Sequence, residues 1–162
     1  MDSVTDSLLE QMRFRLDKDS SWFVPLEKAL DGVTAPIASW RPKDDFNSIW
    51  QIVNHLTFWT AFVSGRLLGA APTGERIDNQ MTFGEPGDPT DEKGWGYSLF
   101  TLYSSYRDFH NHLEKATAED LHRVVNSAGA SALTMMNGCL LHDAYHIGQI
   151  VLLRRLQGVW NG

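Results

Sequence analysis

The sequence has a single cysteine, Cys139, which excludes an internal disulfide framework. Such scarcity is typical of proteins that fold in a reducing compartment. The chain also lacks an apolar run long enough to span a bilayer, and its polar N-terminus, MDSVTDSLLEQMRF, has no signal-peptide pattern. We therefore expect a cytoplasmic protein with no membrane partner.

Basic residues are scarce relative to acidic ones: 14 Lys and Arg against 20 Asp and Glu give a formal net charge of -6. Because no Lys/Arg cluster is present, we expect no nucleic-acid partner. Internal repeats and low-complexity tracts are absent as well. A hydrophobic content of 43% over 162 residues is typical of a globular chain, and we expect residues 1–162 to form a single domain.

Strand patterns are rare, whereas apolar residues recur at helical spacing in four long segments. These segments cover residues 4–16, 47–68, 97–115 and 131–156. Asn47 or Ser48 is expected to cap the second segment, Gly158 to end the fourth, and Thr117 with Asp120 to form a capping box between the last two. The pattern predicts an all-α protein, and specifically a four-helix bundle.

The connections predict the order of these helices. Residues 69–94 hold three prolines and five glycines, so we interpret them as a long loop. Such a loop can return along the whole bundle, which allows the second and third helices to run parallel in an up-down-down-up order. In the earlier connector, TAPIASWRPKDDFN, Pro36 and Pro42 are expected to block regular structure.

The last helix contains the segment LLHDAYHIGQIVLL, in which His142 and His146 are one turn apart. At about 100° per residue, these two histidines and Gln149 fall on one stripe of the helix. Ile150 and Leu153 share that stripe, so we expect it to face the bundle interior.

The second helix has one histidine, His55, on its most apolar face, together with Ile52, Phe58, Trp59 and Phe62. It lies near the middle of its helix, as the pair on the last helix does. The three imidazoles can therefore meet at one level of the core. Buried imidazoles need partners for their ring nitrogens, and a divalent metal is one shared partner. The alternative is that each is a hydrogen-bonded core residue.

A site of His55, His142 and His146 consists of three neutral ligands and leaves a coordination position open, as in catalytic zinc sites. Imidazole suits Zn, Ni, Fe and Cu, and we expect Zn, Ni or Fe here, without a choice among them. Cys139 is a possible fourth ligand that would close the site, but it is better explained as a small buried thiol. His110 is the only plausible substitute ligand.

Several other residues are candidates for the pocket or for contacts behind the ligands. Each of them has either a role near the site or a purely structural role. They are Gln149, Tyr145, Trp59, Tyr103, Tyr106, Asp143 and Arg66. For Asp143 and Arg66 we expect solvated surface charges. His112 and His122 are expected to be exposed. Gly148 lies inside a helix, where we expect it to allow a neighbouring helix to approach closely.

The segments IWQIVNHLTFW and LLHDAYHIGQIVLLRR resemble the DinB/YfiT-like family of metalloenzymes, and the early WFVPLEKALDGV resembles that family's first-helix region. The family pattern has a histidine after a Trp-containing turn in the second helix and a His-x-x-x-His-x-Gly-Gln signature in the fourth. The matching positions are Trp50, His55, His142, His146, Gly148 and Gln149. The resemblance implies a four-helix bundle of the order inferred above, a divalent metal on the three histidines, and a homodimer.

The related family includes transferases and isomerases that use low-molecular-weight thiols such as bacillithiol or mycothiol. This resemblance makes a metal-dependent S-transferase acting on a small-molecule substrate our leading hypothesis. A metal-dependent hydrolase and a noncatalytic, stress-linked dimer that binds a metal or small ligand are the alternatives. No Ser/His/Asp set, phosphate-binding glycine loop or paired-carboxylate motif competes with these readings.

Overall fold

The structure is a computed structural model that describes residues 3–16, 22–70 and 77–162. Within these ranges every regular element is a helix and no strand is present, so the predicted all-α class is confirmed. The elements are α1 (Ser3–Leu16), α2 (Leu26–Leu30), α3 (Ala35–Ser39), α4 (Ile49–Leu67), η1 (Gln80–Thr82), α5 (Glu92–Lys115), α6 (Ala118–His122) and α7 (Ala132–Leu156). None of the described helices has the length and apolar character needed to cross a membrane.

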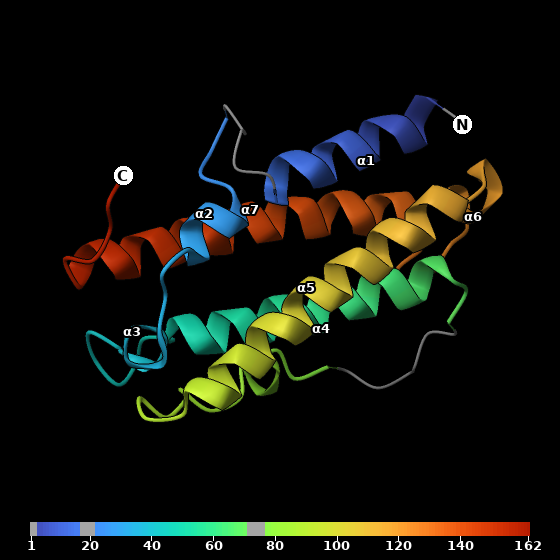
Figure 1. Cartoon of the computed structure of the whole chain (residues 1–162). Coiled ribbons are helices and arrows are strands. Elements are labelled where there is room, and N and C mark those ends of the chain that lie inside the picture. The colour runs from blue at the N-terminus through green and yellow to red at the C-terminus, as the bar shows by residue number, and fades with distance from the viewer. Residues whose placement is uncertain (1–2, 17–21, 71–76) are drawn as a thin grey trace.

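The four long helices α1, α4, α5 and α7 lie alongside one another (Figure 1). In that view α4 and α5 run in one direction, whereas α1 and α7 run in the other. Helix α4 packs against both α5 and α7, and α1 packs against the same two helices. The short helices α2 and α3 lie at one end of this assembly and α6 lies at the other.

The helix boundaries follow from local capping chemistry. Ser48 caps α4: its hydroxyl accepts from the Gln51 backbone N–H while the Gln51 side chain accepts from the Ser48 N–H. Thr117 and Asp120 form the same reciprocal pair at α6, as predicted. Gly158, at φ 72°, follows the last turn of α7, where the left-handed conformation favours glycine.

Two boundaries differ from the prediction. The connector with Pro36 forms the short helix α3, because proline is tolerated in the first turn of a helix, where its missing N–H has no partner to lose. Helix α5 begins at Glu92 rather than near residue 97, because the Asp91 side chain accepts from the Gly94 N–H and caps the helix earlier. The rest of the loop contains η1, and residues 71–76 lie outside the described part of the chain.

The buried apolar side chains form two groups. The first apolar cluster, near α2 and α3, includes Ile52, Leu56, Ile147 and Ile150. The second apolar cluster, near α6, includes Val63, Leu67, Met136, Cys139 and Leu121. On α7 the second cluster precedes His142 and the first begins after His146, so these two histidines lie between the clusters. On α4, His55 lies among residues of the first cluster, between Val53 and Leu56.

Candidate metal centre

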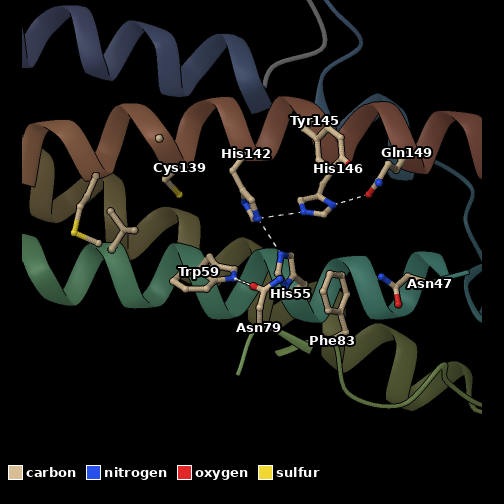
Figure 2. A pocket seen from close by; sticks show the side chains of 13 residues that line it. Asn47, His55, Trp59, Asn79, Phe83, Cys139, His142, Tyr145, His146 and Gln149 are labelled. Carbon is tan, nitrogen blue, oxygen red and sulfur yellow. Dashed lines mark hydrogen bonds between the residues drawn. The ribbon is translucent and has the colours of Figure 1, made fainter. Parts of the chain in front are cut away.

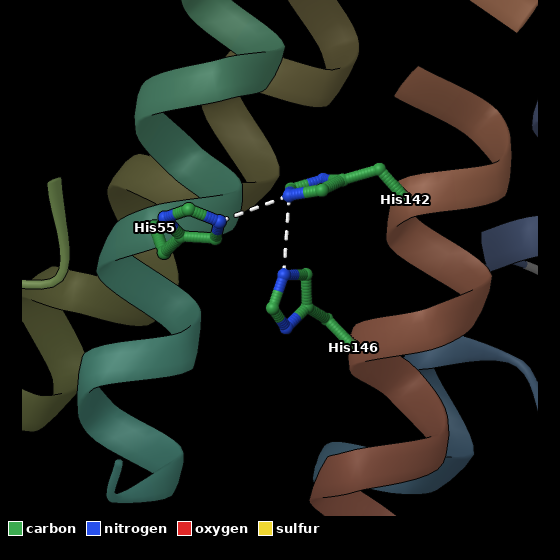
Figure 3. Close-up of side chains that lie close together, drawn as sticks. All are labelled: His55, His142 and His146. Atoms are coloured by element: carbon green, nitrogen blue, oxygen red, sulfur yellow. Dashed lines mark hydrogen bonds between the residues drawn. The ribbon is translucent and has the colours of Figure 1, made fainter. Parts of the chain in front are cut away.

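Three histidine rings from α4 and α7 face one another (Figure 3). His55 projects from the middle of α4, and His142 and His146 project from adjacent turns of α7. The Nε2 atom of His142 lies 2.9 Å from Nε2 of His55 and 3.1 Å from Nε2 of His146. One ligand atom from each ring lies within 4.8 Å of the others, and these three are the group of potential metal ligands found among the described residues.

The loop before α5 contacts His55 at Nδ1, the ring nitrogen that faces away from the other two histidines. His55 Nδ1 contacts the Thr82 hydroxyl. That hydroxyl donates its proton to the Asn79 carbonyl oxygen, 2.6 Å away, so it can only accept from the imidazole. The Nδ1 atom of His55 therefore carries the proton, and its Nε2 presents a lone pair.

The same reasoning applies to His146. Its Nδ1 lies 2.7 Å from Oε1 of Gln149, and an amide oxygen only accepts hydrogen bonds. This partner again fixes the proton on Nδ1 and the lone pair on Nε2. Both lone pairs point toward His142 Nε2.

His142 has a carboxylate behind it. Its Nδ1 lies 3.6 Å from Oδ1 of Asp143, and the Tyr106 hydroxyl donates to Oδ2 of the same carboxylate at 3.1 Å. The separation is too long for a hydrogen bond, but the negative charge favours the ring proton on Nδ1. Three lone pairs then converge on one point. Either a proton on His142 Nε2 or a cation between the rings relieves the repulsion of these lone pairs, and a cation can be bound by all three at once. The donor set therefore fits a divalent metal.

Burial keeps two of these rings, His55 and His146, in the neutral form that binds metal. Burial, together with smaller effects of the neighbouring His146 and His142, lowers the pKa of His55 from its ordinary 6.5 to about 3. Burial and the nearby His142 also lower the pKa of His146. Both rings are therefore neutral near pH 7, and neutral imidazole is the form that ligates a metal.

The histidines lie in the wall of a pocket with a volume of about 590 Å³ (Figure 2). Its lining residues are Asn47, His55, Trp59, Val63, Asn79, Phe83, Met135, Gly138, Cys139, His142, Tyr145, His146 and Gln149. This volume is within the usual range of small-molecule sites. None of these lining residues is Asp, Glu, Lys or Arg. The Phe83 ring stacks on His55, with ring centroids 3.8 Å apart and planes 6° from parallel.

The structure brings most of the predicted pocket residues together. Trp59, Tyr145 and Gln149 line the pocket, and Gln149 is the partner of His146. Tyr103 is not among the lining residues. It lies within electrostatic range of Glu27 and Asp31, and its burial raises the pKa of its hydroxyl to about 12.

Cys139 lines the pocket as a buried thiol, but its sulfur is not in the group of ligand atoms around the histidines. His110 is also outside that group and lies 3.8 Å from Glu114. His122 is exposed, as expected, whereas His112 is half-buried, and its Nδ1 lies 2.8 Å from the Ser64 hydroxyl.

Three other expectations were wrong. Asp143 is fully buried beside Tyr106 rather than solvated. Arg66 is 6% exposed, because its guanidinium donates to the Ala70 carbonyl oxygen at 2.9 Å and packs over the Phe62 ring. A Cβ added at Gly148 would meet open space, so no helix of the described part of the chain approaches there.

The loop residues Asn79, Thr82 and Phe83 were missed by sequence reasoning. They reach the site because the loop is tied to α4: Ser48 donates to the Pro86 carbonyl oxygen, and Gln51 donates to that of Gly84, at 2.7 and 2.9 Å. Loop length was the only signal in the sequence, and it does not say which loop residues reach the histidines.

Comparison with known proteins gives one family. No curated protein matches the sequence. The family model of the DinB superfamily matches residues 25–150, which is most of the chain and includes all three histidines of the cluster. The chain therefore belongs to the DinB superfamily.

Proposed function

We propose that this protein is an enzyme that binds one divalent metal ion through His55, His142 and His146 and uses this ion in its reaction. The observation that supports the proposal most strongly is the convergence of three Nε2 atoms. The Nδ1 atoms of the same rings lie next to Thr82, Asp143 and Gln149. The opposed directions of α1 and α7 against α4 and α5 support the up-down-down-up four-helix bundle that the family resemblance implies.

Three neutral ligands leave the ion's double positive charge uncompensated and leave room for a further ligand from the pocket. A divalent ion bound there supplies Lewis acidity, which lowers the pKa of a coordinated thiol or water. The protein itself contributes ring orientation through Thr82 and Gln149. It also contributes a pocket wall that is mostly apolar.

We propose thiol-dependent S-transfer as the reaction. The thiol loses its proton, its sulfur bonds to an electrophilic carbon of the second substrate, and the electron pair of the bond broken at that carbon leaves with its neighbouring atom. Hydrolysis would need a proton shuttle beside the histidines. No carboxylate or lysine is among the described lining residues, whereas thiolate attack needs no such group. This composition of the wall favours transfer over hydrolysis.

The metal proposal is tested by metal content. We expect wild type and the exposed-histidine control His122→Ala to retain about one ion per chain, and His55→Ala and His146→Ala to lose it, because two ligands bind far more weakly than three. Equal content in all four proteins would contradict the proposal. If the ion is confirmed, thiol-dependent loss of an electrophile that a chelator abolishes supports the transferase. Stoichiometric binding without turnover would instead favour the noncatalytic alternative.

We also propose a homodimer, as the family resemblance implies. Leu141, Leu152 and Leu156 are 74%, 53% and 55% exposed and lie within about 60° of one another on the outer side of α7. An exposed apolar stripe of this kind is typical of an interaction surface. Light scattering should give the mass of two chains for wild type and of one chain for Leu141→Glu/Leu152→Glu. A monomeric wild type would contradict the proposal.

A further inference from the structure

We propose that the second substrate of this site is an uncharged carbonyl compound conjugated to a carbon–carbon double bond, and that its carbonyl oxygen accepts a hydrogen bond from the Asn79 side chain. This inference rests on the proposed function, because it assigns the class of electrophile that the thiol would attack. It is carried by the hydrogen bonds and the lining of the pocket.

The Asn79 carboxamide is oriented by Trp59. The indole Nε1–H of Trp59 donates to Oδ1 of Asn79 at 3.2 Å (Figure 2). Since an indole nitrogen can only donate, the amide must present its oxygen to Trp59, and its NH₂ group is the part left for a ligand. That NH₂ group has no hydrogen-bond partner within the described ranges of the chain. Asn79 is exposed, so water satisfies this NH₂ group in the free protein, and the group that replaces this water on binding must be an acceptor.

Asn79 also lies next to the histidines. Its backbone carbonyl oxygen accepts from the Thr82 hydroxyl at 2.6 Å, and that hydroxyl contacts His55. An acceptor held by the Asn79 amide would therefore bind in the same pocket as the three Nε2 atoms. This placement joins recognition of the substrate oxygen to the site where the sulfur would attack.

The rest of the wall selects against charge. The aromatic rings of Trp59, Phe83 and Tyr145, together with Val63 and Met135, make most of it apolar. The described lining residues include no Lys, Arg, Asp or Glu, so a charged substrate would lose water there without meeting an oppositely charged side chain. An ammonium group would also be repelled by the bound ion, and a carboxylate that turned to the ion would occupy the position proposed for the thiolate. Flat, neutral molecules can instead stack on the rings.

The chemistry balances for such a substrate. The thiolate sulfur forms a bond to the β-carbon, the carbon–carbon π bond breaks, and its electron pair moves onto the carbonyl oxygen. The proton that the thiol released to solvent is replaced by one taken up at the α-carbon. Negative charge grows on the carbonyl oxygen during attack, so the hydrogen bond from Asn79 strengthens in the transition state.

Binding of unreactive probes tests the inference without metal or thiol. The probes are 4-phenylbutan-2-one, the carboxylate 3-phenylpropanoate and the hydrocarbon butylbenzene, which share a phenyl ring on a short chain. We expect the ketone to bind the chelator-treated protein about fivefold more tightly than either comparator. Dissociation constants come from the shift of the Trp59 indole N–H signal in NMR titrations.

The matched variants are Asn79→Asp and Asn111→Asp. The first keeps an oxygen for Trp59 but removes the NH₂ donor, and the second adds the same charge at an exposed position of α5. Asn79→Asp should weaken ketone binding about fivefold, whereas Asn111→Asp should leave it unchanged. A ketone that does not bind, binds no better than the carboxylate, or is indifferent to Asn79→Asp would overturn the inference. Absence of bound metal would contradict only the proposed function, since these titrations need no ion.

Discussion

The two apolar clusters and the histidine level beside them, made of His55, His142, Asp143 and His146, are built on the same helices but differ in what their burial does to the free energy. The clusters contain side chains such as Leu56 and Ile150, which are fully buried and gain free energy by leaving water. The histidine level buries polar rings and a carboxylate, which costs free energy unless each has a partner. The clusters stabilise the fold, whereas the histidine level needs another explanation, which we interpret as metal binding.

The largest expected effects come from truncating one side chain in an apolar cluster and one in the histidine level, which tests whether the two regions have different roles. Ile150→Ala removes a fully buried side chain from the first apolar cluster and should lower the free energy of unfolding by about 2–5 kcal/mol. It should leave about one metal ion per chain. His142→Ala should do the opposite, with loss of the ion and a smaller change in the stability of the metal-free protein. Denaturant unfolding and metal analysis of both variants check this. Equal effects of the two variants on both quantities would erase the distinction.

The next test concerns the residues behind the ligands. Thr82→Val removes the hydroxyl that orients His55 and should weaken metal binding about 10- to 100-fold, while Thr82→Ser should restore it. Thr60→Val is the matched control, because Thr60 is fully buried on α4 but its hydroxyl has no hydrogen-bond partner in the described structure. Competition titrations with a metal indicator measure both. Equal affinity of the two Val variants would show that Thr82 does not position the ring.

A smaller effect is expected one contact further out. Tyr106→Phe removes the hydroxyl that donates to Asp143 and should cost about 0.5–1.5 kcal/mol of stability, while weakening metal binding less than Thr82→Val does. The reason is that Tyr106 acts on His142 only through the carboxylate. The same unfolding and competition experiments apply. A larger loss of affinity than in Thr82→Val would mean that the carboxylate is more important than the ring contacts.

The smallest effect is the pH dependence of the metal-free protein just below neutrality. The pKa of His55 is lowered from 6.5 to about 3 on folding. Between these two pH values the unfolded chain is protonated at His55 and the folded chain is not. The resulting stability is present above pH 6.5 and is lost as the pH falls from 6.5 toward 3. Denaturant midpoints should therefore fall from pH 7 to pH 6, and less so in His55→Gln. Identical pH profiles for the two proteins would contradict this role of His55.

Much of this organisation could be predicted from the sequence because it depends on local spacing. The spacing of His142 and His146, and the capping residues Ser48 and Thr117, act within one or two turns of a helix. Tertiary packing is different. Aspartate is a residue type that is usually exposed, but Asp143 is buried where the Tyr106 hydroxyl of α5 donates to its carboxylate. Thr82 reaches His55 only because the loop is tied back onto α4.

The most direct test of the central claim is X-ray absorption spectroscopy of the zinc-loaded protein before and after a low-molecular-weight thiol is added. We expect three imidazole nitrogens and an exchangeable oxygen before addition, and a sulfur at about 2.3 Å in place of that oxygen afterwards. Fewer than three imidazoles, or a sulfur from Cys139 already present without added thiol, would contradict an open site of three histidines.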